Sequence, residues 1–238
     1  MKMMILAPRR AGLSHAAFRR YVIEVHGPLV KSVPEVARAI RHYHYNFPVH
    51  GTYDRAFGHP SADHLDIVTQ GWFDSREAQL ANMREPRYLE IVRPDEHRFA
   101  DGAGAVMHYT HEVGIVPDPT LRARNKAFYF RRRRAHLSRE AFQTAWRTRY
   151  AAALTASAVC QDVFSKYVQN HTLPEADHPD GSADRYFDVI DEMFLRAPDS
   201  LAEFGQDPAA LERLRILEDE LLEPGFTRFL LTETIVNS

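Results

Sequence analysis

The feature that most constrains the fold of this chain is an internal repeat. The stretch AGLSHAAFRRYVIEVHGPLV at residues 11–30 returns as AHLSREAFQTAWRTRYAAAL at residues 135–154, an offset of 124 positions. The two stretches align without gaps and place Ser14 on Ser138, where a serine side chain can cap the first turn of a helix. Each copy must therefore fold into the same unit, which decides the architecture before any other pattern does.

The correspondence extends along both halves of the chain. At the same offset, AIRHYHYNFPV (39–49) falls on VFSKYVQNHTL (163–173). Further on, LDIVTQGWF (65–73) matches FDVIDEMFL (187–195) at an offset of 122, as loops of different length would produce. The sequence therefore predicts two divergent copies of one unit.

The two copies define two domains, residues 1–117 and 123–238, joined by a linker around Pro117 and Pro119. Each copy reads as strand, helix, two strands, helix and strand. The first helix of the first copy carries apolar residues at i, i+3, i+4 and i+7, and the strands are rich in aromatic and β-branched residues. The expected second helices cover about 75–83 and 200–214, and the expected closing strands cover 105–116 and 226–236.

This order is that of the ferredoxin-like βαββαβ unit, whose four-stranded sheet has helices on one face and leaves the other face bare. Two such sheets can bury their bare faces against each other. We therefore predict an α+β protein in which two ferredoxin-like repeats pack sheet to sheet as an α+β barrel within one chain.

Composition and charge argue against nucleic-acid and membrane partners. Thirty Lys and Arg against 32 Asp and Glu give a formal net charge of −2, so no broad surface for nucleic acid is implied. The run of four arginines at 131–134 follows an apolar stretch and precedes a helix cap, and we interpret it as a solvated strand end. The single cysteine, Cys160, fits a reducing compartment, and the apolar run at the amino terminus is too short to span a membrane. We expect a soluble, cytoplasmic protein without nucleic-acid or membrane partners.

The motifs resemble those of the EthD domain family. RRAGLSHAAFRRYVIEVHGPLV is similar to the opening of that domain, in which a Gly-Leu-Ser helix cap leads to a His-Gly/Ala-Pro-Leu motif. LDIVTQGWFDS and KYVQNHTLPEA resemble two further stretches of the family. The resemblance implies a dimeric α+β barrel, here closed within one chain. It implies a range of activities: cofactor-free decarboxylases or dehydratases of aromatic or polyketide metabolism, with cofactor-free monooxygenases and haem enzymes as relatives on the fold.

Each copy departs from the family pattern at one position. The second copy has Tyr150 where the first has His26, and the first copy has Gln70 where the second has Glu192, the residue that the family tends to carry there. The polar residues expected at one site are thus divided between the two copies. We therefore predict one working pocket and one degenerate pocket.

His26 is the first catalytic candidate, because an imidazole titrates near neutral pH and Gly27 and Pro28 must bend or loosen the helix beside it. The alternative is a histidine that only holds a kinked helix against the sheet. On the following strand, alternation places His42, His44 and Asn46 on one face and Tyr43 and Tyr45 on the other. Which face points inward is left open. The further candidates are His44 and Tyr45 for catalysis and His42, Tyr43 and Asn46 for substrate binding.

The third strand places Asp66, Gln70 and Trp72 on one face. Asp66 is a candidate proton donor if an apolar wall raises its pKa, or a residue at a solvated strand start. Trp72 is a candidate wall of the site and otherwise a core residue. The corresponding positions of the second copy complete the predicted substrate-binding set: Tyr150, Tyr167, Asn170, His171 and Glu192.

No phosphate loop, dinucleotide fingerprint, nucleophile elbow or paired-cysteine site is present in the sequence. We therefore expect no organic cofactor and no metal. The leading hypothesis is an acid/base lyase or isomerase that dehydrates or decarboxylates a hydrophobic, aromatic or polyketide-like carbonyl compound. The alternatives are a cofactor-free or haem-dependent monooxygenase and a non-catalytic small-ligand binding protein. A homodimer is expected only weakly.

Overall fold

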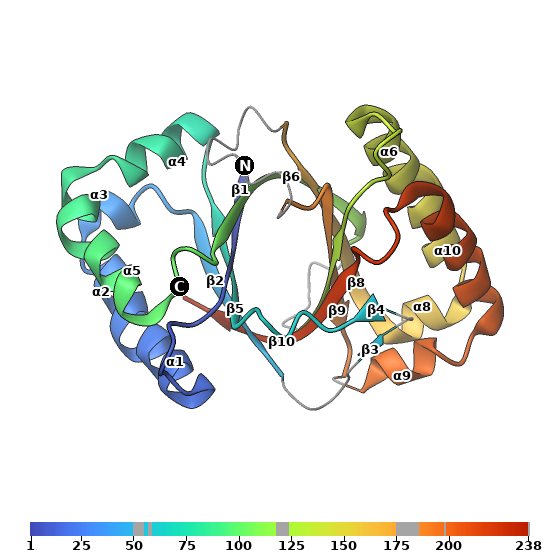
Figure 1. The fold of residues 1–238 in the computed structure, drawn as a ribbon, viewed down its shortest axis with the longest axis horizontal. Helices are drawn as coiled ribbons and strands as arrows, with labels where there is room; N and C mark the ends of the chain where they lie inside the picture. The colour runs from blue at the N-terminus through green and yellow to red at the C-terminus, as the bar shows by residue number, and fades with distance from the viewer. Residues whose placement is uncertain (50–54, 57–58, 118–123, 175–185, 198, 238) are drawn as a thin grey trace.

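A computed structural model describes residues 1–49, 55–56, 59–117, 124–174, 186–197 and 199–237. Eight antiparallel strands form a closed barrel in the order β1-β5-β2-β10-β7-β9-β8-β6 (Figure 1). The barrel strands are β1 (Lys2–Ala7), β2 (His42–Pro48), β5 (Ile67–Trp72), β6 (Val106–Val116), β7 (Asn125–Arg131), β8 (Phe164–Thr172), β9 (Val189–Leu195) and β10 (Arg228–Val236). A short hairpin of β3 (Arg55–Ala56) and β4 (His59–Pro60) lies outside the barrel sheet.

Helices cover the barrel on two opposite sides (Figure 1). The first group is α1 (His15–Tyr21), the π-helical turn η1 (Val22–His26), α2 (Gly27–Lys31), α3 (Pro34–Ala37), α4 (Arg76–Met83), η2 (Tyr88–Val92) and α5 (Arg93–Phe99). The second group is α6 (Arg139–Ala145), η3 (Trp146–Tyr150), α7 (Ala151–Thr155), α8 (Ala158–Val163), α9 (Ser200–Phe204) and α10 (Pro208–Leu221). We call the strands β1, β2, β5 and β6 with the first group the N-terminal half, and the rest of the barrel with the second group the C-terminal half.

The two halves close the barrel edge to edge. Strand β2 pairs with β10 and β6 pairs with β8, all antiparallel. Within the halves the strands are ordered β6-β1-β5-β2 and β10-β7-β9-β8. Closure removes every exposed edge of the barrel sheet, which is the usual way to prevent edge-to-edge association.

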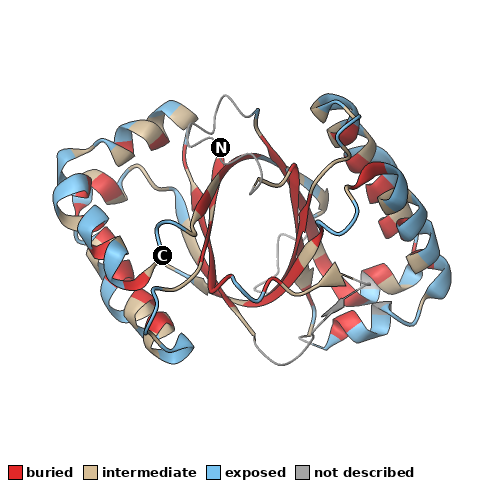
Figure 2. Cartoon of the chain, in the orientation of Figure 1, coloured by how far each residue is buried: buried red, intermediate tan, exposed pale blue. Residues whose placement is uncertain are grey.

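Alternation along the strands separates two kinds of core. Even-numbered residues such as Met4, Val68 and Phe128 pack together in the barrel interior, while odd-numbered residues such as Tyr45 and Tyr129 pack toward the helices. Figure 2 shows the buried positions concentrated on the barrel strands, with exposed positions on the outer sides of the helices.

The predicted helix starts are confirmed. Ser14 and Ser138 each accept a hydrogen bond from a backbone N–H three residues on, and Ser75 caps α4 in the same way. The prediction of a single helix over 200–214 was wrong. The segment forms two helices, because Pro208 starts a new one whose N-cap is Asp207.

The helices over 88–99 were not expected, and the linker expected around Pro119 lies outside the described residues. Within the described ranges, no helix has the length and apolar character needed to cross a membrane.

Candidate functional site

A cavity of about 300 Å³ lies between the outer face of the N-terminal sheet and the helices that cover it. The sheet contributes odd-numbered residues of β1, β2, β5 and β6, and the helices contribute η1 and the η2–α5 segment. Most of the lining is apolar, and the polar groups are few. The polar side chains are His26, Tyr43, Tyr45, Thr69, Tyr88, Arg93, Glu96 and His97. An apolar hollow with a few convergent polar groups is the usual form of a small-molecule site.

Local sequence places His26 in this cavity. Phe18 and Val22 hold the preceding helix against the sheet, and the chain then forms the wide π-helical turn that ends at His26. Gly27 allows close packing, because a Cβ there would lie 3.3 Å from the side chain of Asn237 and from the backbone oxygen of Val22. His26 is only 3% exposed. The expected loosening of the helix before Pro28 is thus confirmed, and π-helical turns are frequent at functional sites.

Two side chains orient the His26 ring. Nδ1 lies 3.0 Å from Oδ2 of Asp95, and Oδ1 of Asp95 accepts a hydrogen bond of 2.5 Å from the Tyr21 hydroxyl. Phe99 packs on the ring at 4.6 Å between centroids. Burial lowers the pKa of His26 below 6.5, although Asp95 acts in the opposite direction. The imidazole is therefore neutral at pH 7. With Nδ1 donating to Asp95, the lone pair is on Nε2, the arrangement of a general base.

Three tyrosine hydroxyls are further polar groups of the cavity. The rings of Tyr43 and Tyr45 lie 5.1 Å apart, and the Tyr88 hydroxyl donates a 2.7 Å hydrogen bond to Glu96. Burial raises the pKa of all three tyrosines above 10, with Glu96 adding to the effect on Tyr88. All three hydroxyls stay protonated at neutral pH. The Tyr88 proton is used in the bond to Glu96, whereas Tyr43 and Tyr45 can donate hydrogen bonds to an oxygen that gains negative charge.

The opposite face of β2 places His42 and His44 away from this cavity. Both rings meet the edge of Trp72, at 6.0 and 4.9 Å between centroids. Burial, and then the charge of Lys126, lower the pKa of His44 to about 4. The structure therefore separates His44 from His26 and Tyr45, which share the cavity.

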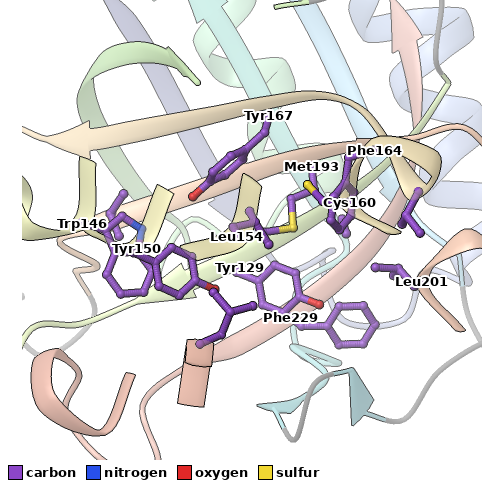
Figure 3. Close-up of a cluster of buried hydrophobic side chains, with 14 of the residues drawn as sticks. Tyr129, Trp146, Tyr150, Leu154, Cys160, Phe164, Tyr167, Met193, Leu201 and Phe229 are labelled. Atoms are coloured by element: carbon purple, nitrogen blue, oxygen red, sulfur yellow. The ribbon is translucent and has the colours of Figure 1, made fainter. Parts of the chain in front are cut away.

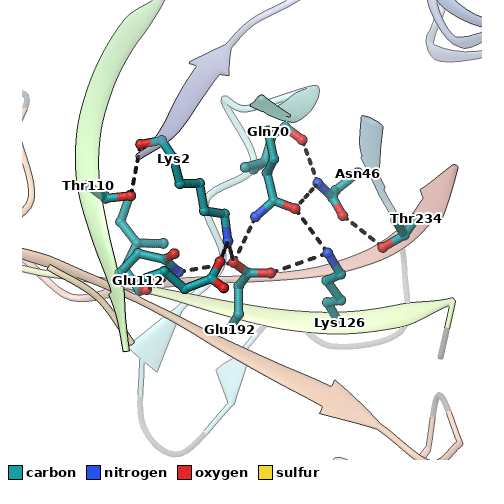
Figure 4. Close-up of polar contacts among 11 residues, drawn as sticks. Lys2, Asn46, Gln70, Thr110, Glu112, Lys126, Glu192 and Thr234 are labelled. Atoms are coloured by element: carbon teal, nitrogen blue, oxygen red, sulfur yellow. Dashed lines mark hydrogen bonds and ion pairs between the residues drawn. The ribbon is translucent and has the colours of Figure 1, made fainter. Parts of the chain in front are cut away.

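A polar cluster fills the centre of the barrel (Figure 4). The carboxylate of Glu192 contacts Lys2, lies 3.2 Å from Nζ of Lys126, and accepts hydrogen bonds from Gln70 at 2.7 Å and Asn170 at 3.0 Å. Asn46 joins the same cluster by donating to Gln70 at 3.1 Å. Asn46, Asn170 and Glu192, all expected to bind substrate, are thus joined through Gln70 in one cluster and are at most 1% exposed.

Asp66 has a different environment from the one expected of a proton donor. Its carboxylate accepts hydrogen bonds from the backbone N–H of Arg9 at 2.8 Å and from the Arg9 guanidinium at 2.6 Å. In the C-terminal half Asp188 accepts a hydrogen bond of 2.9 Å from the backbone N–H of Arg133 and forms an ion pair with its guanidinium at 3.2 Å. A contact present in both halves, outside the lining of the cavity, indicates that Asp66 fixes the end of a strand. We correct the expectation of an apolar wall around it.

In the C-terminal half, side chains occupy the space between sheet and helices (Figure 3). Tyr150, at the position of His26, stacks on Trp146 at 3.7 Å and accepts a 2.9 Å hydrogen bond from Arg131. Tyr167 donates to Asp191, which also binds Arg131 at 2.8 Å. These five residues are at most 2% exposed.

The interpretation of the arginine run as a solvated strand end was wrong for Arg131. Aromatic rings and two carboxylates enclose its guanidinium, including Glu218 at 2.6 Å. His171 is also buried in this half, and burial lowers its pKa to about 4. Tyr150, Tyr167 and His171 therefore lie in a packed core and not with His26.

Sequence reasoning missed Asp95, Tyr21, Tyr88 and Glu96. Three of them lie on the segment over 88–99, for which no helix was expected. The available signal was RPDEHRF, in which a proline and two acidic residues mark the first turn of a helix. Among the residues that the structure describes, no group of three or more His, Cys, Asp or Glu side chains could hold a metal ion.

Comparisons with known proteins support the resemblance to the EthD domain. The EthD domain model matches residues 10–103, which include His26, Tyr45 and Asp95. The chain is 33% identical over 112 residues to a protein of Metarhizium robertsii named conidial pigment biosynthesis dehydratase EthD, over 43% of this chain and 75% of that one.

Solved structures share the fold at low identity. An anthrone oxidase-like protein aligns with a TM-score of 0.65 and 9% identity, over 100% of this chain and 93% of the other. A putative monooxygenase from Fusobacterium nucleatum aligns with a TM-score of 0.59 and 5% identity, over 99% and 92%. One from Lactobacillus acidophilus aligns with a TM-score of 0.52 and 6% identity, over 100% and 93%.

Proposed function

The chain belongs to the EthD domain family, and from this premise we propose that it is a lyase that dehydrates a hydrophobic, aromatic hydroxy-carbonyl compound in the cavity of its N-terminal half. The observation that carries the proposal is the contact of 3.0 Å between His26 and Asp95 at the wall of this cavity. The name of the Metarhizium robertsii relative, a dehydratase, supports the same reaction type.

We propose the following proton movements. Nε2 of His26 removes a proton from the carbon next to the substrate carbonyl, and the electron pair moves onto the carbonyl oxygen. A tyrosine hydroxyl, from Tyr43 or Tyr45, donates a hydrogen bond to that oxygen. The bond from the adjacent carbon to its hydroxyl then breaks, and the His26 imidazolium returns the proton to the departing hydroxide. One water leaves, and His26 is neutral again.

Asp95 and Tyr21 serve this scheme as positioning residues. The Asp95 carboxylate holds the proton on Nδ1 and stabilises the imidazolium that forms between the two steps. The apolar lining and the covering helices exclude water, which strengthens each electrostatic interaction.

The experiment is a dehydration assay with β-hydroxy ketones fused to a benzene ring, followed by mass spectrometry for the loss of one water. We expect His26→Ala to lower kcat about 10²–10⁴-fold, the usual contribution of a general base. His136→Ala is the matched control, because this histidine is exposed and lies outside the cavity lining. Equal loss in both variants would sink the role of His26.

The same assay separates the alternatives. A product that gains one oxygen and forms only in air would indicate a monooxygenase. Ligand binding without turnover, unchanged by His26→Ala, would indicate a binding protein. The solved monooxygenase-like neighbours share 5–9% identity with the chain and support the fold alone.

We also propose that the two halves are ferredoxin-like repeats, since both follow the strand order four-one-three-two. Under this proposal the first repeat retains the working cavity, and Tyr150, Trp146 and Arg131 fill the corresponding space of the second. A cytoplasmic location and a homodimer stay predictions from the sequence.

A further inference from the structure

A second hollow, of about 410 Å³, opens beside the candidate active cavity at the start of β2. We call it the vestibule and define it by the residues that line it: Val30, Lys31, Ala37, Ile40, Arg41, His42, Tyr43, His44, Val236 and Asn237. The end of β10 closes one side of it, where the backbone N–H of Asn237 donates to the oxygen of Tyr43 at 2.8 Å. The C-terminal end thus lies beside the N-terminal helices (Figure 1).

The vestibule has a basic character. Lys31 and Arg41 line it, and no Asp or Glu is among the described residues of its lining. Outside the lining, Asp74 forms a two-bond ion pair with Arg41, through Nε at 2.8 Å and through Nη2, and holds the guanidinium in place. On the barrel side, Nδ1 of His44 is buried without a hydrogen-bond partner among the described residues. A hollow lined by two cationic side chains suits an anionic oxygen ligand.

Tyr43 connects the vestibule to the candidate active cavity. Its side chain lines both hollows and also a small one of about 50 Å³ between them. That small hollow shares Glu96 and Tyr88 with the active cavity and shares Val30 and Ile40 with the vestibule. The three hollows therefore follow one another around Tyr43.

We propose that the vestibule binds the carboxylate of an elongated aromatic acid whose other end lies against His26. The proposal deepens the proposed function and rests on it for the position of the reacting end. Lys31 and Arg41 bind the carboxylate, the Tyr43 ring packs on the aromatic body, and the apolar cavity takes the reacting ring. The substrate class is thus an aromatic acid, with the acidic group remote from the carbon that loses its proton.

Binding of a non-reacting probe tests the proposal without turnover. Isothermal titration calorimetry of the full chain would compare 4-phenylbenzoate with its uncharged partner 4-phenylbenzamide. We expect the acid to bind at least about tenfold more tightly than the amide, and less tightly as salt is added. The double variant Lys31→Gln/Arg41→Gln should weaken the acid at least about tenfold and leave the amide unchanged. Arg38→Gln, a neighbouring exposed charge outside the lining, should change neither by more than about twofold.

Each outcome decides the question. Equal affinity for acid and amide, or unchanged binding of the acid to the double variant, would overturn the proposal. The single variant Lys31→Gln keeps the test valid if the double variant fails to fold, because Lys31 is exposed on α2. Acid binding without any dehydration of the ketones would refute the proposed function and support the vestibule as a carboxylate site. Dehydration without acid binding would support the proposed function and refute the carboxylate site.

Discussion

Glu192→Gln tests the electrostatic balance of the barrel interior. The side chain keeps its size but loses the charge that faces two lysines, each 2% exposed. In the native protein burial acts to raise the pKa of Glu192, but Lys2 and Lys126 outweigh it and hold the pKa well below its usual range. The variant leaves these lysines with Glu112, which binds Lys2 at 3.0 Å from a partly exposed position.

The size of the loss follows from the state of Lys126. Burial lowers its pKa from 10.5 to about 8 even with Glu192 in place, which corresponds to about 3 kcal/mol against the charged form. Removing one partner of a buried ion pair costs about 3–5 kcal/mol. We therefore expect the free energy of unfolding to fall by about 3–5 kcal/mol at pH 7. The loss should shrink at pH 10, where folded Lys126 is neutral and needs no counter-charge.

Urea unfolding followed by circular dichroism at both pH values measures the effect. The barrel offers a matched control, since Gln70 on β5 of the N-terminal half stands where Glu192 stands on β9 of the C-terminal half, and it binds Lys126 at 2.9 Å. The exchange variant Gln70→Glu/Glu192→Gln should recover most of the lost stability. A loss below about 1 kcal/mol for Glu192→Gln alone, or no recovery on exchange, would refute the reasoning.

Three further predictions concern the two halves. Because burial lowers the pKa of His26, kcat/KM should stay level around pH 7 and fall on the acid side with an apparent pKa below 6.5. Asp95→Asn should move this acid limb of the pH profile to still lower pH and reduce kcat. An acid limb above pH 7 would contradict the assignment of His26 as the base. Asp66→Asn should lower the free energy of unfolding by about 1–3 kcal/mol, because the bonds to Arg9 are lost. A changed pH profile of turnover in this variant would instead indicate that Asp66 is a catalytic proton donor. Trp146→Ala should lower the free energy of unfolding, measured by heat or urea, by about 3–5 kcal/mol and leave ligand binding by the N-terminal half intact. Lost binding in a folded variant would argue for a site in the C-terminal half.

Several features of the site were within reach of the sequence. The HGP motif identified His26 as a candidate and predicted the loosened helix around it, because proline has no backbone N–H to donate within a helix. Alternation along β2 separated the histidine face from the tyrosine face. The replacement of His26 by Tyr150 predicted that the second pocket would differ from the first.

Other features needed long-range contacts that no local pattern contains. Asp95 lies 69 positions from His26, in a segment for which no helix was expected. Asp66 shares its strand face with Gln70, yet only the fold shows that Arg9 binds it. The arginine run gave no sign that Arg131 is enclosed by a tryptophan and two carboxylates.

The sequence by itself predicted two copies of one unit, the order of the barrel strands, and His26 as a candidate residue, because periodicity, caps and motifs act over a few positions. Only the tertiary structure decided which strand face meets the helices and which fills the barrel. That choice depends on how eight strands close into one sheet, and closure pairs β2 with β10 and β6 with β8, strands that lie far apart in the chain. It brings Tyr45 to His26, sends His44 to the opposite face, and leaves open in the N-terminal half the space that Trp146 and Tyr150 fill in the other.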